Sequence, residues 1–186
     1  MQELIEQFSL ERVSKSGAKF DYEKGKWFNH QYLQLRSNEE LAEQFIPYLE
    51  EKGISGDKDT VAKVIGLTKD RVNFVSELWD QVNFFFVAPT EYDEKSLKKR
   101  WKEDSPKHMT EMLALLEAHD DWSAEGLDNL IMPWIAEKEY GVGIVMNAFR
   151  ICLVGAARGP HIWNITDVLG KEETLRRVRT ALEKLG

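Results

Sequence analysis

The stretch SNEELAEQFIPYLEEKG, residues 37–53, indicates the kind of fold that this sequence forms. Ser37 and Glu40 stand three residues apart, in the capping-box pattern that begins a helix. Gly53 is the type of residue that ends one. The stretch therefore predicts an amphipathic helix with a defined start and end. Its large apolar residues follow at helical spacing: Leu41, Phe45, Tyr48 and Leu49.

The segments that follow carry similar helix signals. Asp57 is expected to cap a helix that ends near Gly66, and Thr68 is expected to cap the next helix. The apolar run FFFVAP, residues 84–89, is short enough for a strand, but we favour the end of a buried helix. A linker then leads into a strongly basic helix, KSLKKRW, residues 95–101.

The C-terminal half shows the same kinds of helix start and stop signals. Ser105 before Pro106 predicts an N-cap followed by proline in the first turn, and Ser123 predicts another N-cap. Pro133 is expected to kink or interrupt the helix that Ser123 begins, and a last helix is expected after Gly170. Helix signals dominate throughout, so the sequence predicts an all-α fold of helical bundles.

Composition narrows the functional classes. The chain has 186 residues, 42% hydrophobic and 31% charged, which is typical of a soluble globular protein. No apolar run approaches the roughly 18 to 20 residues that span a bilayer, and no secretory leader is evident. The single cysteine, Cys152, is expected to be a buried packing residue in a reducing compartment.

Charge is unevenly distributed along the chain. The net charge of −7 argues against a general nucleic-acid binder. From Arg150 onward, however, seven Lys and Arg side chains oppose four Asp and Glu. A basic C-terminal part on an acidic chain is compatible with a surface that faces phosphates, and equally with solvated helices.

Motifs for catalysis are absent from the sequence: there is no GxGxxG, Walker loop, HExxH or GxSxG. The four histidines are scattered and share no metal-ligand spacing. Residues 12–16, RVSKS, look like the phosphate-binding KMSKS loop of class I aminoacyl-tRNA synthetases. That loop requires a parallel sheet and a HIGH-type histidine pair, and the sequence shows neither, so we expect a connection between helices.

A longer match changes the interpretation. Residues 8–33, FSLERVSKSGAKFDYEKGKWFNHQYL, resemble the segment that follows the true KMSKS loop in bacterial glutamyl-tRNA synthetases. The chain departs from that family at Gly25, where leucine is usual, and at Cys152 and Val154 near the C-terminus. The matching residues are Phe8, Ser9, Glu11, Arg12, Val13, Lys15, Ser16, Ala18, Phe20, Asp21, Lys24, Trp27, Asn29 and Tyr32, and, in the second block, Arg150, Gly155, Gly159, Pro160, Leu169, Gly170 and Arg177.

The resemblance implies a C-terminal fragment of a glutamate–tRNA ligase that lacks the Rossmann catalytic domain. It implies residues 1–36 as the end of the stem-contact region, and residues 37–90 and 91–186 as two helical anticodon-binding subdomains forming a cage. The implied partner is tRNA(Glu), with no membrane or DNA partner, and the parent enzyme would be a cytoplasmic monomer. The fragment would hold no cofactor and no catalytic or metal site, since ATP and magnesium would serve the missing domain.

The resemblance also directs attention to basic residues. Arg71, with Lys69 beside it at an expected helix start, would help to read the last anticodon letter; the alternative is a solvated ion pair with Asp70. Arg150 is embedded in NAFRICLV, so it needs either an anion or a carboxylate partner. Arg158 would contact phosphate from an exposed loop, or nothing. Lys15, Lys19 and Lys24 would follow the phosphates of the inner stem.

Two other functional classes stay open at this point. A helical protein–protein interaction module would also suit an acidic, tryptophan-containing chain. A small enzyme with an unrecognised site would require titratable groups clustered in a deep pocket.

Overall fold

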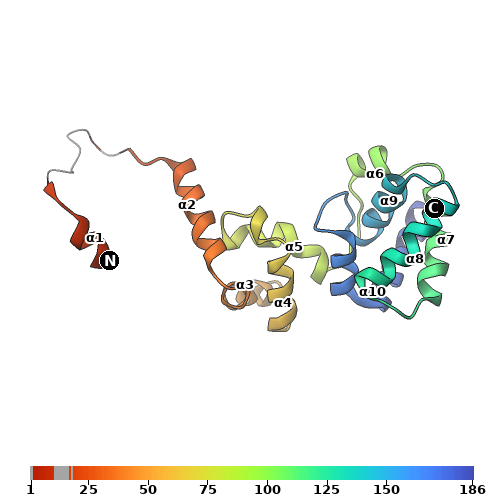
Figure 1. Ribbon diagram of the computed structural model, residues 1–186, viewed down its shortest axis with the longest axis horizontal. Coiled ribbons are helices and arrows are strands. Elements are labelled where there is room, and N and C mark those ends of the chain that lie inside the picture. The colour runs from red at the N-terminus through yellow and green to blue at the C-terminus, as the bar shows by residue number, and fades with distance from the viewer. Residues whose placement is uncertain (1, 11–16, 18) are drawn as a thin grey trace.

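The structure is a computed structural model that describes residues 2–10, 17 and 19–186. It is elongated, with α1 and α2 at one end, α3 to α5 in the middle and α6 to α10 at the other end (Figure 1). Over the described residues the regular elements are helical and none is a strand, which confirms the all-α prediction. The α-helices are α1 (Gln2–Gln7), α2 (Tyr22–Leu35), α3 (Asn38–Glu51), α4 (Lys58–Gly66), α5 (Leu78–Phe86), α6 (Glu94–Arg100), α7 (Ser105–Ala118), α8 (Ala124–Glu137), α9 (Val142–Val154) and α10 (Ile162–Leu185).

The predicted caps of the middle group are present. The Ser37 hydroxyl accepts from the Glu40 amide at 3.1 Å, and the Glu40 carboxylate accepts from the Ser37 amide at 3.0 Å. The Asp57 carboxylate accepts from the Thr60 amide at 2.9 Å at the start of α4. Each cap satisfies backbone donors that a helix leaves free at its first turn. The helices α3 and α4 pack against each other and bury Leu41, Phe45, Leu49, Val61, Val64 and Ile65.

The prediction that Thr68 caps a long helix is wrong. Its hydroxyl donates back to the Val64 carbonyl at 3.0 Å, inside the preceding helix, and it accepts no capping bond from an amide ahead of it. Two single-turn 3-10 helices follow instead, Lys69–Arg71 and Val75–Glu77, and α5 begins only at Leu78. Lys69 and Arg71 therefore lie on a 3-10 turn rather than at the start of an α-helix.

Ser105 is also not an N-cap. It is the first residue of α7, after Asp104, and its hydroxyl accepts from the Lys102 amide at 2.7 Å. Pro133 does not interrupt its helix, because α8 runs through it to Glu137. Both Pro133 and Asn129, four residues earlier, are exposed, so water can satisfy the carbonyl that proline leaves without a donor. The Ser123 cap is confirmed by its bond from the Gly126 amide at 3.0 Å.

The final helix is longer than the sequence predicts. It begins at Ile162, and its one residue outside helical geometry is Gly170, with φ 74° and ψ 171°. Glycine adopts this left-handed φ without a steric penalty, so the chain bends there and resumes its helix over the predicted segment. Cys152 lies fully buried on α9, as predicted, and burial raises the pKa of its thiol well above the usual range.

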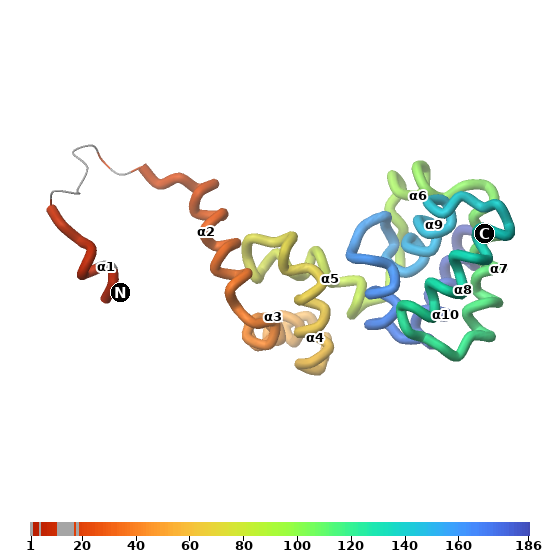
Figure 2. Tube along the Cα trace, viewed as in Figure 1, coloured from red at the N-terminus to blue at the C-terminus, as the bar shows by residue number. Residues whose placement is uncertain are grey.

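Polar contacts join the middle group to the C-terminal group, and we call this contact region the seam. Lys63 on α4 forms an ion pair with Asp167 on α10 at 2.7 Å. Arg177 on α10 donates to the Phe84 carbonyl on α5 at 2.6 Å and to the Leu153 carbonyl on α9 at 2.7 Å. Figure 2 shows the chain passing from α5 into α6 beside this region. The predicted division at residues 36/37 and 90/91 stays a prediction.

No helix in the part of the chain that the structure describes is long and apolar enough to cross a membrane.

Candidate nucleic-acid interface

Arg71 is presented to solvent by its short turn. Its amide donates to the Thr68 carbonyl at 3.0 Å, which fixes the turn, and its side chain is 42% exposed. The Arg71 Nε lies 3.9 Å from the Asp70 carboxylate, at the outer limit of an ion pair between exposed groups. Such a pair contributes little. The guanidinium therefore keeps its donors available for a ligand.

Lys69, next to Arg71, is engaged with the protein. Its ammonium donates to the Arg36 carbonyl at 3.2 Å, directly after α2 ends. A cation at a helix C-terminus interacts favourably with the free carbonyls there. Lys69 thus connects the turn to α2, and any contact with a nucleic acid would compete with that bond.

Arg150 reaches the seam from α9, where it is half-buried. Its Nη1 donates to the Pro160 carbonyl at 2.6 Å and to the Arg158 carbonyl at 3.2 Å. Burial, and then the positive charge of nearby Arg71, lowers the pKa of Arg150. The carboxylate partner that the sequence suggested is not found for Arg150 among the described residues; its bonds there go to backbone carbonyls. Two neighbouring like charges favour a bound anion.

Arg158 follows on the loop after α9 and folds against α5. Its guanidinium donates to the Asp80 carbonyl and, at 3.2 Å, to the Asn83 side-chain oxygen. It also lies 5.9 Å from the centre of the Phe84 ring. Arg158 was predicted to lie on an exposed loop, and it is exposed, but these contacts also hold the loop on the middle group. Asn83 could not be predicted as a partner of Arg158, because the two residues are 75 positions apart in the sequence.

Gly159 allows the loop to approach this closely. Its φ is 108°, in the region that favours glycine, and a Cβ there would lie 3.2 Å from the Phe84 ring and 3.5 Å from the Arg150 guanidinium. A side chain would therefore crowd the Phe84 ring, against which Arg158 also lies. Two sequence-predicted residues, Arg150 and Arg158, are thus brought together at the seam. Arg71 lies near enough for its charge to act on Arg150, and we call the three residues the arginine cluster.

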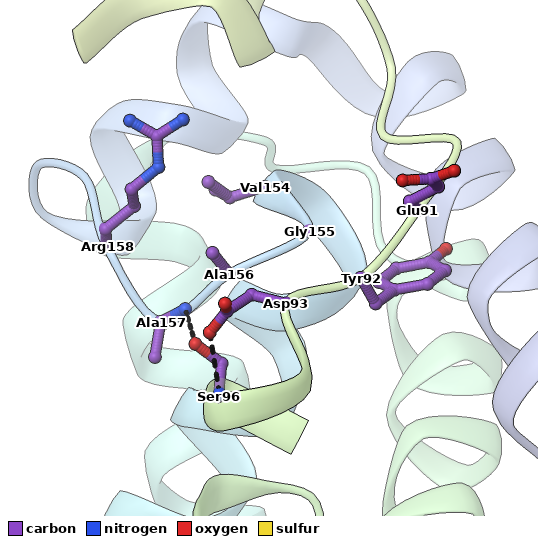
Figure 3. Close-up of a pocket in the computed structure, with 9 residues that line it drawn as sticks. All are labelled: Glu91, Tyr92, Asp93, Ser96, Val154, Gly155, Ala156, Ala157 and Arg158. Atoms are coloured by element: carbon purple, nitrogen blue, oxygen red, sulfur yellow. Dashed lines mark hydrogen bonds between the residues drawn. The ribbon is translucent and has the colours of Figure 1, made fainter. Parts of the chain in front are cut away.

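A cavity of about 590 Å³ lies beside the cluster, between the segment Glu91–Ser96 and the loop Val154–Arg158. Figure 3 shows Asp93 and Ser96 on one side of it and the Arg158 side chain extending away from them. The Ser96 hydroxyl accepts from the Ala157 amide at 3.0 Å, which closes that side. Because Glu91 and Asp93 line the cavity, it is a poor place for a phosphate, whereas the arginine cluster is a good one.

The lysines predicted to follow the inner stem do not belong to the arginine cluster. Lys19 and Lys24 belong to the N-terminal arm, by which we mean residues 2–10, 17 and 19–36. The end of this arm contacts the turn that carries Arg71, through Gln34 and Arg36, whereas its start lies toward α1, away from the middle group (Figure 1). The Lys24 ammonium sits 5.9 Å from the Phe28 ring, and Lys19 is exposed. Lys15 and the RVSKS motif lie outside the described residues.

An all-α chain that gathers arginines at an exposed seam, where Arg150 bonds to carbonyls rather than to a carboxylate, has the features of a helical module that binds an anionic polymer. Within the described residues no group of three or more His, Cys, Asp or Glu side chains could hold a metal ion. Comparison with known proteins identifies the kind of module: the family model described as "Anticodon binding domain" matches residues 40–182. The chain belongs to this family.

Relatives agree with that assignment. The chain is 57% identical to the glutamate–tRNA ligase of Phocaeicola vulgatus and 45% identical to that of Flavobacterium johnsoniae, over its whole length in each case. It spans 37% of the length of each relative. The crystal structure of a glutamate tRNA ligase from Elizabethkingia meningosepticum, in complex with its amino acid, superposes with a TM-score of 0.92 at 38% identity. That match covers 100% of this chain and 37% of the other.

Proposed function

We propose that this chain binds the anticodon loop and inner stem of tRNA(Glu), and that the whole protein is a cytoplasmic, monomeric glutamate–tRNA ligase. The observation that carries the proposal is the arginine cluster on a chain of the anticodon-binding domain family. In an anticodon loop the bases are splayed out, so a guanidinium can stack on them or pair with their edges.

The proposal separates recognition from chemistry. ATP and magnesium would be used by the whole enzyme to join glutamate to tRNA, and we assign them no residue of this chain. The chain alone is therefore expected to bind tRNA but to carry out neither aminoacylation nor ATP–pyrophosphate exchange. The glutamate anticodon has a central U and a terminal C, and we assign the reading of that terminal base to Arg71.

Salt dependence of binding tests the proposal. The affinity of the chain for a tRNA(Glu) transcript should fall steeply as salt rises, because phosphate contacts release counterions. Replacing Arg150 by alanine should lower the slope of log K against log salt by about one. Arg179→Ala is the matched control, because Arg179 lies on α10 and pairs with Glu117 at 2.5 Å. Binding that ignores salt, or an equal loss of slope in both variants, would contradict the proposal.

A further inference from the structure

Three side chains of α2 donate hydrogen bonds to the backbone around Arg71. The Gln34 amide donates to the Lys69 carbonyl at 2.8 Å, and the Asn29 amide donates to the Asn73 carbonyl. The His30 Nδ1 lies 2.8 Å from the Val72 carbonyl. A carbonyl only accepts, so Nδ1 carries the proton in this pair. These partners are between 35 and 44 residues apart in the sequence.

The three bonds bracket Arg71 on both sides, at residues 69, 72 and 73. From the other direction, the Glu77 carboxylate accepts from the Asn73 amide at 2.7 Å and from the Phe74 amide at 3.3 Å. A single 3-10 turn has almost no hydrogen-bond ladder of its own. External donors therefore take the place of that ladder and fix the backbone from which Arg71 projects.

The contacts between α2 and the turn are mainly directional hydrogen bonds rather than apolar packing. Leu33 is the one buried residue of α2, whereas Asn29, His30 and Gln34 are partly buried against the turn. Hydrogen bonds weaken steeply when their angles are poor, so three of them at separate points set the orientation of a backbone segment. Apolar contact of the same size would hold the turn in place without orienting it.

We propose that Gln34, His30 and Asn29 are positioning residues for anticodon recognition, and that they act through Arg71. The proposal rests on the proposed function. A guanidinium that distinguishes one base from another must be held close to its productive geometry by the residues behind it. Removing the α2 donors would leave carbonyls that water can reach, so the expected loss is in discrimination rather than in folding.

The test measures a discrimination ratio: the affinity for a hairpin with the glutamate anticodon loop, divided by the affinity for the same hairpin with the terminal C changed to U. Arg71→Ala should lower this ratio by about tenfold, the value of one good base contact. The double variant Gln34→Ala/His30→Ala should lower it by at least about threefold. Gln31→Ala, an exposed glutamine on the same helix, is the matched control and should leave it unchanged.

Combination with Arg71→Ala identifies the route of the effect. Because the α2 residues act through Arg71, the double variant should cause no further loss of discrimination in the Arg71→Ala background. The variant His30→Asn keeps a donor at the position of Nδ1 and should retain most of the ratio. Urea denaturation of each variant shows whether it folds. If the alanine variants do not fold, the discrimination ratio can still be measured with His30→Asn.

Each outcome decides a separate point. An unchanged ratio in Gln34→Ala/His30→Ala, when Arg71→Ala lowers it, overturns the positioning role and leaves the proposed function intact. An equal loss with and without Arg71 overturns it as well, because the residues then act by another route. If Arg71→Ala leaves the ratio unchanged, Arg71 does not read this base and the inference fails with it. If the affinity of the chain for each hairpin did not change with salt concentration, the proposed function itself would be contradicted.

Discussion

The N-terminal arm and the C-terminal group are built from similar residues but are held in opposite ways. Nine of the twelve large hydrophobic side chains that stand exposed among the described residues precede residue 36. On α9 in the C-terminal group, seven of thirteen residues are buried. The C-terminal group is therefore stabilised by apolar burial, whereas α2 meets the middle group mainly through hydrogen bonds to a backbone turn. Substitutions in the C-terminal group should therefore change the stability of the fold, whereas substitutions on α2 should change the geometry of the turn that α2 contacts.

Two tryptophans give the largest expected contrast between the regions. Trp163 on α10 is 3% exposed and donates from Nε1 to the Asp128 carboxylate at 2.7 Å. Trp163→Ala should lower the free energy of unfolding by about 4 kcal/mol, through lost burial and the cavity left behind. Trp27 on α2 is 57% exposed, so Trp27→Ala should change it by less than about 0.5 kcal/mol. Urea denaturation measures both, and similar losses would remove the contrast.

Arg177 offers the next contrast, within the C-terminal group itself. It is 3% exposed, and it bonds to Glu173 at 2.7 Å and to the carbonyls of Phe84 and Leu153. Arg177→Met should cost about 3 kcal/mol, because it leaves buried acceptors and a carboxylate without donors.

Arg176→Met is the control for Arg177, since Arg176 pairs with the same carboxylate at 2.7 Å but is exposed to water. Its cost should stay below about 1 kcal/mol. If the two variants were equally stable, Arg177 would not connect α5 and α9 to α10.

Acid should act on the same network. Hydrogen bonds from Arg176 and then Arg177 lower the pKa of Glu173 from 4.5 to about 2. A carboxyl with a depressed folded-state pKa contributes stability above its unfolded-state pKa, and that contribution is lost as pH falls from about 4.5 towards 2. Over this window the wild type should lose about 2 kcal/mol more than Glu173→Gln. Parallel stability curves for the two proteins would show that Glu173 is not part of the network.

The sequence predicted best what is local. The caps at Ser37, Asp57 and Ser123 each depend on a residue three positions away, and all are confirmed. The cap at Thr68 is wrong because a threonine hydroxyl can also bond backwards to its own helix, a choice that the local pattern does not decide. Pro133 is tolerated because it faces water, and exposure is set by tertiary packing.

The sequence predicted which residues belong to the candidate site, but not how they are arranged in space. Arg71, Arg150 and Arg158 were each singled out from the sequence, yet their convergence depends on contacts such as Arg158 with Asn83, 75 positions apart. The role of the α2 donors behind Arg71 could not be predicted: Asn29 matches the family pattern without indicating a partner, and histidine and glutamine on an exposed helix resemble any solvated face. Arg177 is indistinguishable by type from Arg176 and Arg179, and only folding separates a buried arginine from two exposed ones. The roles of all seven predicted basic residues in binding tRNA stay predictions.

The most direct test of the central claim, that the arginine cluster holds the anticodon, is photo-crosslinking. A tRNA(Glu) transcript with 4-thiouridine at the central anticodon position would be irradiated in complex with the chain, and the attached peptides mapped by mass spectrometry. We expect crosslinks on residues 69–74 and 150–160, next to Arg71, Arg150 and Arg158. Crosslinks confined to α7, which lies at the end of the molecule away from α3 to α5 (Figure 1), would contradict the claim.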